Sequence, residues 1–399
     1  MLTGYPRADG RKGVRNVAVV AYLVECAHHV AREIALEFRG AHGDGVHVIG
    51  FPGCYPNDYA QRMMEALCTH PNVGAAVLVS LGCESFNKSR LHRVVEDSGR
   101  PVRTVVIQGV GGTAKAIDAG RAFLDDVLPR LAQSERVPMD LSELVVGTVC
   151  GGSDGTSGIT GNPAAGLAFD RLVAEGAACI FEETGELIGC EHVMADRAET
   201  PELAEALRAS VEKAARYYAT LGYGSFAAGN AEGGLSTIEE KSLGAYAKSG
   251  ASRISGLLKP GDVPPRGGLY LLDVVPDGEV RFGFPNINDN AEIAELMACG
   301  AHLTYFVTGR GSVVGSAISP VIKICANPET YARMADDMDV DAGRVLRGAP
   351  LAEVGEEIFD KTLATAAGAR TRSEALGHQE FILTYKTFEP LGPACLPAA

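Results

Sequence analysis

The first third of the chain alternates apolar runs with amphipathic stretches. The apolar runs, which predict buried strands, lie at 14–24, 45–51, 73–82 and 102–108. Stretches with a helical spacing of apolar residues lie at 26–38, 58–70, near Leu91 and at 109–133. Strands that alternate with helices are typical of a parallel sheet covered by helices.

The same pattern starts again at Leu144. Its predicted strands lie at 144–149, 177–183, 269–275 and 302–309. Its predicted helices lie at 163–176, 204–221 and 291–300. The polar stretch 134–143 separates the two patterns. The sequence therefore predicts two α/β domains with mainly parallel sheets, at 1–138 and 139–399.

Composition narrows the class of protein. A chain of 399 residues that is 46% hydrophobic can bury a large core. The net charge of -14 disfavours nucleic acid and anionic membranes as partners, and an anionic substrate would need local cations. No apolar run approaches the roughly 20 residues of a membrane span, and the first residues lack the apolar segment of a secretory signal. We expect a cytoplasmic protein that binds neither membrane nor nucleic acid.

Ten cysteines are too few for a disulfide scaffold of this size. Three of them, Cys54, Cys83 and Cys150, each follow an apolar strand and have a glycine beside the thiol. Ligands bind outside the carboxyl ends of parallel strands, so these thiols are predicted at a functional edge. Together they could hold iron or an iron–sulfur cluster, and the alternative is packing or a non-metal role. Five others fall inside helix or strand patterns and are predicted to be buried: Cys26, Cys68, Cys179, Cys299 and Cys325.

The stretch 145–166, VVGTVCGGSDGTSGITGNPAAG, is the strongest candidate for chemistry. Asn162 and Pro163 match a helix start, with Asn162 as the N-cap. Before them, Gly152, Ser153 and Asp154 would let backbone amides and side chains approach a ligand, and a helix N-terminus favours an anion such as a substrate carboxylate. The alternative is a tight turn that needs only glycine.

Cations after other strands could hold the same carboxylate. Arg310 lies between two glycines, with Thr308 before it and Lys323 in the next apolar run. An arginine fork binds a carboxylate at two points. Arg15 with Asn16 could add a further contact near the N-terminus. In each case the alternative is an ordinary solvated charge.

Four residues are candidates for the base that removes a proton next to the carboxylate. Glu239 and Lys241 follow a Gly-Gly turn, and a carboxylate beside an ammonium can shift the pKa of either group. Glu84, beside Cys83, and His192 are the second-choice candidates. A charged helix start is the alternative for the first pair, and a structural role is the alternative for His192.

Six stretches of the chain resemble the altronate and galactarate dehydratase family. They are GYPRADGRKGVRN, HPNVGAAVLVSLGCE, CGGSDGTSGITGNPAAG, ETGELIGCEH, GNAEGGLSTIEEKSLGA and TGRGSVVGSAISPVIKICAN. The resemblance implies Rossmann-like domains and an iron-dependent lyase acting on hydroxylated acids. Water would leave carbon 3, and the enol would ketonise to a 2-keto-3-deoxy acid. The implied metal is ferrous iron or an iron–sulfur cluster, with Mn²⁺ as an alternative.

The chain also departs from that family. Fused members carry a small β-rich domain before GYPRADGRKGVRN, so this chain looks like the large subunit of a split enzyme, and we expect a small β-rich partner and a homo-oligomer. It has GCEH where members often have GAEH, and FPGCYPND and the C-terminal stretch 384–399 do not match the sugar-acid enzymes. A relative with split subunits, the (2R)-sulfolactate sulfo-lyase, releases sulfite and pyruvate by a similar β-elimination.

Dehydration of a sugar acid is the function that we favour. The sulfo-lyase large subunit is the first alternative, and it would need one more basic pocket for the sulfonate. The second alternative is a binding subunit that has kept the fold without catalysis, although the cysteine, glutamate and cation contexts all survive here. Motif and fold alone do not fix the substrate.

Overall fold

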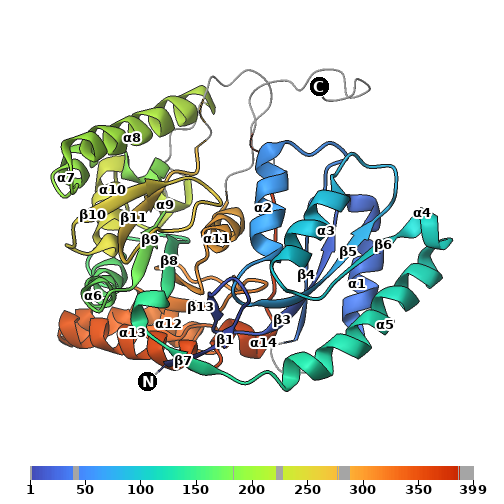
Figure 1. The fold of residues 1–399 in the computed structure, drawn as a ribbon. Helices are drawn as coiled ribbons and strands as arrows, with labels where there is room; N and C mark the ends of the chain where they lie inside the picture. The colour runs from blue at the N-terminus through green and yellow to red at the C-terminus, as the bar shows by residue number, and fades with distance from the viewer. Residues whose placement is uncertain are drawn as a thin grey trace. The chain divides into compact units, whose positions relative to one another are not determined.

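The computed structural model describes residues 2–38, 45–182, 184–221, 228–275, 277, 288–384 and 386. The chain divides into two compact units (Figure 1). The N-terminal unit contains Tyr5–Val137 with short later segments, and the C-terminal unit contains Pro138–Val275 and Glu295–Glu380 with residues 2–4. The domain ranges 1–138 and 139–399 stay a prediction.

A four-stranded parallel sheet forms the core of the N-terminal unit. Its order is β4-β3-β5-β6, with β3 at Val17–Tyr22, β4 at Val46–Gly50, β5 at Val73–Ser80 and β6 at Val102–Val106. Helices α1 (His28–Leu36) and α5 (Thr113–Ala132) pack on one face. Helices α2 (Asp58–Cys68) and α3 (Lys88–Asp97) pack together and also contact the sheet (Figure 1). A small separate sheet of order β2-β1-β7 is formed by Lys12–Gly13, Leu2–Pro6 and Val137–Met139.

A seven-stranded parallel sheet forms the core of the C-terminal unit. Its order is β10-β11-β9-β8-β12-β13-β14, with bounds Ile254–Leu258, Gly268–Leu272, Ala178–Phe181, Val145–Cys150, Leu303–Thr308, Val321–Cys325 and Val340–Asp341. All its pairings are parallel. The chain leaves β8 toward β9 on one side, whereas β12 lies on the other side. The carboxyl ends of β8 and β12 therefore meet at a topological switch point, where open α/β sheets bind ligands.

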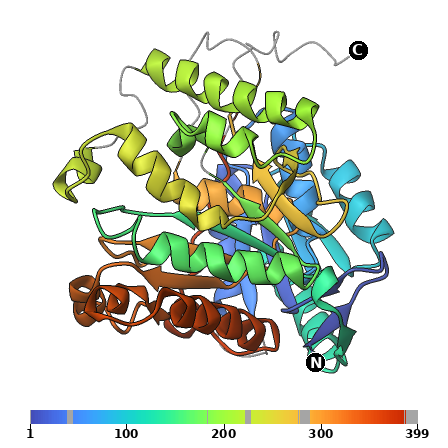
Figure 2. The same cartoon turned by 90° about the vertical axis from the view of Figure 1, so that its left-hand side faces the viewer.

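Helices flank this sheet. Helix α6 (Gly161–Ala174) runs beside α13 (Leu351–Ala366) in both Figure 1 and Figure 2. The other helices are α7 at Glu191–Ala195, α8 at Pro201–Leu221, α9 at Ala228–Glu232, α10 at Ile238–Tyr246, α11 at Asp289–Ala298, α12 at Pro328–Arg333 and α14 at Arg372–Leu376. Short 3₁₀ turns lie at Glu25–Ala27, Leu141–Glu143, Thr184–Leu187, Ala247–Ser249 and Ala342–Arg347.

The predicted α/β class with two Rossmann-like, mainly parallel sheets is confirmed, but some local predictions are wrong. Stretch 109–133 is not one helix, because α4 (Ile107–Val110) ends at Gly111 and Gly112, whose φ values of 94° and 107° break the helix. Asn162 is not an N-cap, because α6 already begins at Gly161 after Thr160. Residue 183 of the predicted strand 177–183, and most of 384–399, lie outside the described residues.

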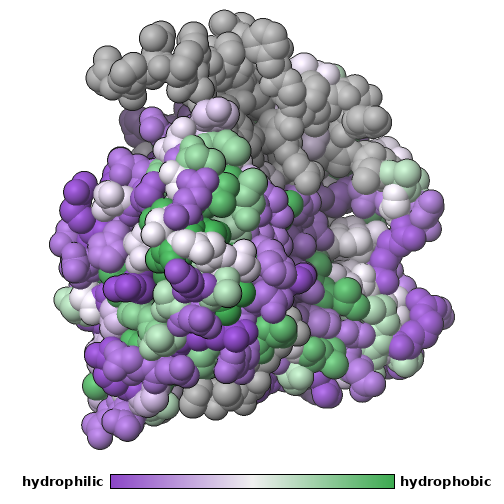
Figure 3. Space-filling model, turned by 90° about the vertical axis from the view of Figure 1, so that its right-hand side faces the viewer, coloured by the Kyte–Doolittle hydropathy of each residue, from purple (hydrophilic) through white to green (hydrophobic). Residues whose placement is uncertain are grey.

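Four of the five cysteines predicted to be buried are buried: Cys68, Cys179, Cys299 and Cys325. Cys26 is exposed, contrary to prediction, because it lies in the 3₁₀ turn before α1 rather than on the inner face of that helix. Within the described part of the chain, no helix is long and apolar enough to cross a membrane. The face drawn in Figure 3 carries many hydrophilic side chains with smaller groups of hydrophobic ones between them.

Candidate functional site

A cavity of about 280 Å³ lies at the N-terminal end of α6 in the C-terminal unit. One wall is the loop that joins β8 to α6, and the other is α10 with the turn before it. The lining residues are Ser153, Asp154, Gly155, Ser157, Gly158, Ile159, Asn162, Leu235, Glu240, Lys241, Leu243 and Gly244. The walls touch at Gly158 and Gly244, since a Cβ on Gly158 would lie 3.0 Å from the Cα of Gly244. A β-carbon at either position would push them apart.

A group of four polar side chains, which we call the lysine cluster, stands at one end of this cavity. It consists of Cys150, Ser153, Glu186 and Lys241. The Cys150 thiol donates to Glu186 Oε2 at 2.9 Å, and the Lys241 ammonium forms an ion pair with Glu186 Oε1. Lys241 Nζ also donates to Ser153 Oγ at 3.4 Å. The Lys241 side chain is only 3% exposed, so this ammonium acts where water screens charge weakly.

The Cys150 thiol is held in its neutral form. Burial raises the pKa of this thiol, and the neighbouring Glu186 carboxylate raises it further. The ammonium groups of Lys248 and Lys241 act in the opposite direction. Because burial and the carboxylate prevail, the sulfur is a poor nucleophile at neutral pH.

Asn162 lies in the first turn of α6 and lines the cavity. It is 2% exposed, and its Oδ1 finds no hydrogen-bond partner among the described residues. The dipole of a helix this long makes its start attractive to an anion, although the Asn162 amide already donates to the Ser157 carbonyl at 3.0 Å and Pro163 has no amide hydrogen. The cavity thus combines a cation, a helix start and a buried polar acceptor.

Asp154 lines the cavity, but its oxygens are already engaged. Oδ1 accepts from the backbone and hydroxyl of Thr156, and Oδ2 accepts from Asn327 Nδ2 at 2.9 Å. A Cβ on Gly309 would lie 2.1 Å from Asp154 Oδ1, so the carboxylate is packed against the end of β12. Asp154 therefore joins the loop after β8 to the segments that follow β12 and β13.

Thr308, Arg310 and Gly152 lie at the switch point, outside the residues that line the cavity. The Thr308 hydroxyl donates to the Gly152 carbonyl at 3.1 Å and accepts from the Gly311 amide at 3.0 Å. Arg310 is 40% exposed and forms an ion pair with Glu232 at 3.1 Å. Its fork is occupied by an acidic partner, and Thr308 serves to join the two strand ends.

Lys323 is fully buried in the middle of β13 and does not line the cavity. Its Nζ has no hydrogen-bond partner in the part of the chain that the structure describes. Burial lowers the pKa of this ammonium, against the opposing charges of Asp337, Asp339 and Glu380.

Two predicted bases, Glu239 and His192, are not among the residues that line the cavity. Glu239 is exposed on α10, and its side chain faces Gly189, whose Cβ would lie 3.1 Å from Glu239 Cγ. His192 is exposed on α7. Lys241 is the predicted base that lines the cavity.

The remaining predicted residues belong to the N-terminal unit. The Glu84 carboxylate accepts from the Ser80 hydroxyl and, at 2.8 Å, from the Gly82 amide, so it is held within its own loop. Arg15 and Asn16 are buried, and Asn16 donates to the Leu131 carbonyl at 2.9 Å. Each of these residues therefore has structural contacts inside the unit.

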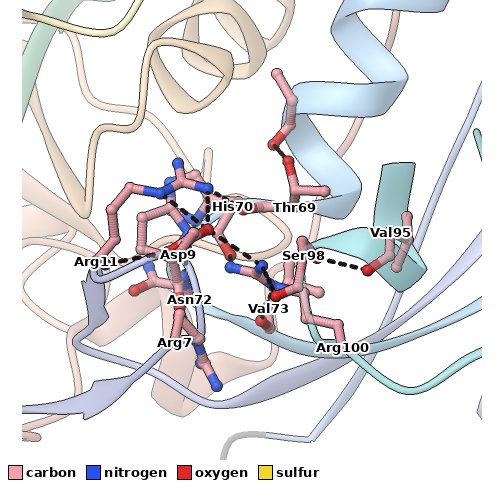
Figure 4. A network of polar contacts seen from close by, with 12 residues as sticks. Arg7, Asp9, Arg11, Thr69, His70, Asn72, Val73, Val95, Ser98 and Arg100 are labelled. Atoms are coloured by element: carbon pink, nitrogen blue, oxygen red, sulfur yellow. Dashed lines mark hydrogen bonds and ion pairs between the residues drawn. The ribbon is translucent and has the colours of Figure 1, made fainter. Parts of the chain in front are cut away.

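Beside Arg15 and Asn16 lies a set of charges that we call the arginine network: Arg7, Asp9, Arg11 and Arg100 (Figure 4). Arg7 donates to the Pro71 carbonyl at 2.7 Å, and burial lowers its pKa to about 9. Arg100 donates to the backbone carbonyls of Val73 and His70 and to the Asp9 carboxylate. The N–H groups of Arg7 and Arg100 therefore donate mostly to backbone carbonyls.

The thiols predicted to bind iron are divided between the units. Cys54 and Cys83 are exposed in the N-terminal unit, and the Ser85 amide donates to the Cys54 carbonyl at 2.9 Å, which places their two loops side by side. Cys150 is in the C-terminal unit. Among the described residues, no group of three or more His, Cys, Asp or Glu side chains is arranged to hold a metal ion. The shared iron site stays a prediction.

Sequence reasoning missed Glu186, which links the thiol to the ammonium. Glu186 belongs to ETGELIGCEH, one of the stretches that carry the family resemblance, but its local pattern does not distinguish it from the other acidic residues there. It also missed Lys248, which is fully buried and lies close enough to lower the pKa of Cys150. Only the tertiary fold brings these residues to the end of β8.

Comparison with known proteins gives matches along nearly the whole chain. Residues 141–388 match the C-terminal model of D-galactarate/altronate dehydratase, and residues 4–132 match the second-domain model of D-galactarate dehydratase/altronate hydrolase. The chain is 34% identical to the (2R)-sulfolactate sulfo-lyase subunit beta of Chromohalobacter salexigens, over 96% of each protein. It is 31% identical to the altronate dehydratase of Escherichia coli, over 95% of this chain and 76% of that enzyme. It is 33% identical to the galactarate dehydratase (L-threo-forming) of Escherichia coli, over 77% of this chain and 59% of that enzyme.

Proposed function

Because the chain belongs to the D-galactarate/altronate dehydratase family, we propose that it is a lyase that removes a group from carbon 3 of a 2-hydroxy carboxylate. In the main proposal the substrate is a sugar acid of the altronate or galactarate type. A base takes the proton from carbon 2, the hydroxyl leaves carbon 3 as water, and the enol ketonises to a 2-keto-3-deoxy acid. The observation that carries this proposal is the match, over most of the chain, to relatives named as dehydratases and as a sulfo-lyase subunit.

The cavity at the start of α6 supports binding of such a substrate. Lys241 and the dipole of α6 offer positive charge to a carboxylate, and Ser153 offers a hydroxyl. As the carbon 2 proton leaves, negative charge develops on that carboxylate. Lys241 would stabilise this charge, since an ammonium held by Glu186 is suited to electrostatic stabilisation.

Metal dependence is a separate part of the proposal. Cys150 and Glu186 offer one soft and one hard donor, 2.9 Å apart. Two donors do not complete a metal site, and the described residues provide no group of three, so no reaction step here is assigned to a metal. We propose ferrous iron as the cofactor, with an iron–sulfur cluster or Mn²⁺ as alternatives. Chelation should then abolish turnover, ferrous iron should restore it, and metal analysis should find less iron in Cys150→Ser than in the wild type.

A second candidate function is favoured by one observation. The match to the sulfo-lyase subunit covers 96% of both chains, whereas the matches to the two dehydratases cover 76% and 59% of those enzymes. In this alternative, sulfite leaves carbon 3 of 3-sulfolactate and the enol becomes pyruvate. A small β-rich subunit would then be the partner of this chain.

One set of assays separates these functions. The purified chain, alone and with a co-expressed small subunit, is given D-altronate, galactarate and 3-sulfolactate, with and without Fe²⁺ or Mn²⁺. Keto acid and sulfite are both measured. Keto acid without sulfite supports dehydration, and pyruvate with equal sulfite supports the alternative. Absence of both products with every substrate would favour a non-catalytic subunit.

A further inference from the structure

Asn162 is a buried hydrogen-bond acceptor that lines the cavity and that no described residue satisfies. A buried carbonyl oxygen without a donor is unfavourable, and native proteins rarely keep one without a reason. Asn162 is in the first turn of α6, where an anionic ligand is also favoured. A ligand that brings a hydroxyl to Oδ1 would remove this cost.

The charges of the cavity restrict the ligand further. Among its lining residues one is cationic, Lys241, and two are acidic, Asp154 and Glu240. Lys241 is already paired with Glu186. A first carboxylate can share the ammonium and the helix dipole, but a second anionic group would lie near the buried carboxylate of Asp154, where water screens charge weakly.

We infer that this cavity takes a hydroxy acid with a single negative charge, whose carboxylate lies at Lys241 and whose hydroxyl donates to Asn162 Oδ1. This inference rests on the proposed function and deepens it, because it distinguishes altronate, with one carboxylate, from galactarate and 3-sulfolactate, with two anionic groups each. The charges of the cavity make this distinction, whereas Asn162 sets the orientation of the ligand, since an ionised carboxylate or sulfonate has no proton to donate to Oδ1 and a hydroxyl does.

The test compares removal of the substrate hydroxyl with removal of its acceptor. Calorimetry measures binding of D-altronate and its monodeoxy analogues to the wild type and to Asn162→Leu, which has a similar volume and no acceptor. For one deoxy position, loss of the hydroxyl should weaken wild-type binding about tenfold or more, because the acceptor is left buried and unpaired. The same loss should have no effect in Asn162→Leu. Galactarate and 3-sulfolactate should bind the wild type at least about tenfold more weakly than altronate.

Two further variants keep the result interpretable. Thr148 is also fully buried, and its hydroxyl has no hydrogen-bond partner among the described residues, but it lies outside the cavity, so Thr148→Val should leave all affinities unchanged. Asn162→Asp keeps an acceptor and adds charge, so it should retain the hydroxyl preference and bind altronate more weakly. If Asn162→Leu does not fold, Asn162→Ala replaces it, because alanine also removes the acceptor.

The inference would be overturned if loss of the substrate hydroxyl weakened binding equally in the wild type and in Asn162→Leu, or if Asn162→Asp no longer preferred the hydroxylated ligand. It would also be overturned if galactarate or 3-sulfolactate bound more tightly than altronate, or if altronate did not bind. Binding with the expected preferences but without turnover would sustain the inference and reject the proposed function. Turnover of altronate, with equal loss of affinity for the deoxy analogue in the wild type and in Asn162→Leu, would sustain the proposed function and reject the inference.

Discussion

The arginine network and the lysine cluster each contain a buried cation, Arg100 in the first and Lys241 in the second, but they differ in the partners that surround it. In the arginine network, backbone carbonyls and Asp9 accept hydrogen bonds from Arg7 and Arg100. In the lysine cluster, Lys241 has Glu186 and Ser153 as partners and borders a cavity. Asn162 lines the same cavity, and its Oδ1 has no hydrogen-bond donor among the described residues. A network completed by the backbone stabilises the fold, whereas one that borders a cavity can still bind a ligand.

Arginine and lysine suit these two roles. The planar guanidinium offers five donors in fixed directions, so one arginine can join several chain segments. Arg100 links the backbone at Val73 and His70 to Asp9. The ammonium is a compact charge that can turn toward a new partner. The comparison predicts that changes in the lysine cluster reduce activity and changes in the arginine network reduce stability.

The largest effect is expected from Lys241→Met. Removing the cation should lower kcat/KM by about 10²- to 10³-fold, because the charge that develops on the substrate carboxylate loses its stabilisation. Lys241→Arg separates two roles: arginine keeps the charge but does not act as a base at neutral pH. Partial activity in Lys241→Arg would support electrostatic stabilisation, and inactivity equal to that of Lys241→Met would identify Lys241 as the base. The exposed Lys115→Met serves as the control and should have wild-type kinetics.

The next effect concerns stability. Arg100→Met should lower the free energy of unfolding by about 3 kcal/mol, because buried carbonyls at Val73 and His70 lose their donor. Arg130→Met is the matched control. It breaks an exposed ion pair with Asp126 and should cost less than about 0.5 kcal/mol. Denaturant unfolding followed by circular dichroism gives both values, and equal losses would contradict a structural role for the network.

Buried parallel strands could be predicted from the sequence, since both faces of each strand are covered and the run becomes continuously apolar. Stretch 73–82 contains β5 at Val73–Ser80, for example. Breaks between helices were harder to predict, because Gly111 and Gly112 end α4 through their backbone conformation and not through a change of polarity.

Some residues of the site could be predicted from the sequence, and others could not, because local patterns are visible in the sequence and tertiary contacts are not. The end of a strand is visible in the sequence and identified Cys150 and Ser153, whereas Lys241 was identified from its place after a Gly-Gly turn. The partners of a charge are set by tertiary contacts, so neither the role of Glu186 between Cys150 and Lys241 nor the pairing of Arg310 with Glu232 could be derived.

A smaller effect is expected in thiol reactivity. The raised pKa of Cys150 should make it resist iodoacetamide at pH 8, while the exposed Cys54 and Cys83 react first. Glu186→Gln removes a negative charge that raises this pKa, so alkylation of Cys150 should become several-fold faster. Cys68 is the control, because burial is the main cause that raises its pKa, to about 12, and Glu186 plays no part. Mass mapping of labelled peptides measures all four thiols, and faster labelling of Cys68 as well would indicate general loosening instead.

The smallest effect is expected at Asp9, which is partly exposed in the arginine network. Burial raises the pKa of this carboxyl, but hydrogen bonds from Arg11 and the charges of Arg11 and Arg100 outweigh it, so the pKa lies below its usual value of 3.8. A carboxylate with a lowered pKa contributes stability above the unfolded-state value, and this contribution is lost as the pH falls through the folded-state value. Wild-type stability should therefore contain a small term, well under about 1 kcal/mol, that disappears below pH 4.

Asp9→Asn should lack this term, so that urea unfolding curves of variant and wild type differ at pH 5 and converge toward pH 3. Asp126→Asn, in an exposed ion pair, provides the matched comparison. A constant difference between Asp9→Asn and wild type over this pH range would mean that the carboxylate charge adds nothing to the network, which would then depend on the backbone carbonyls alone.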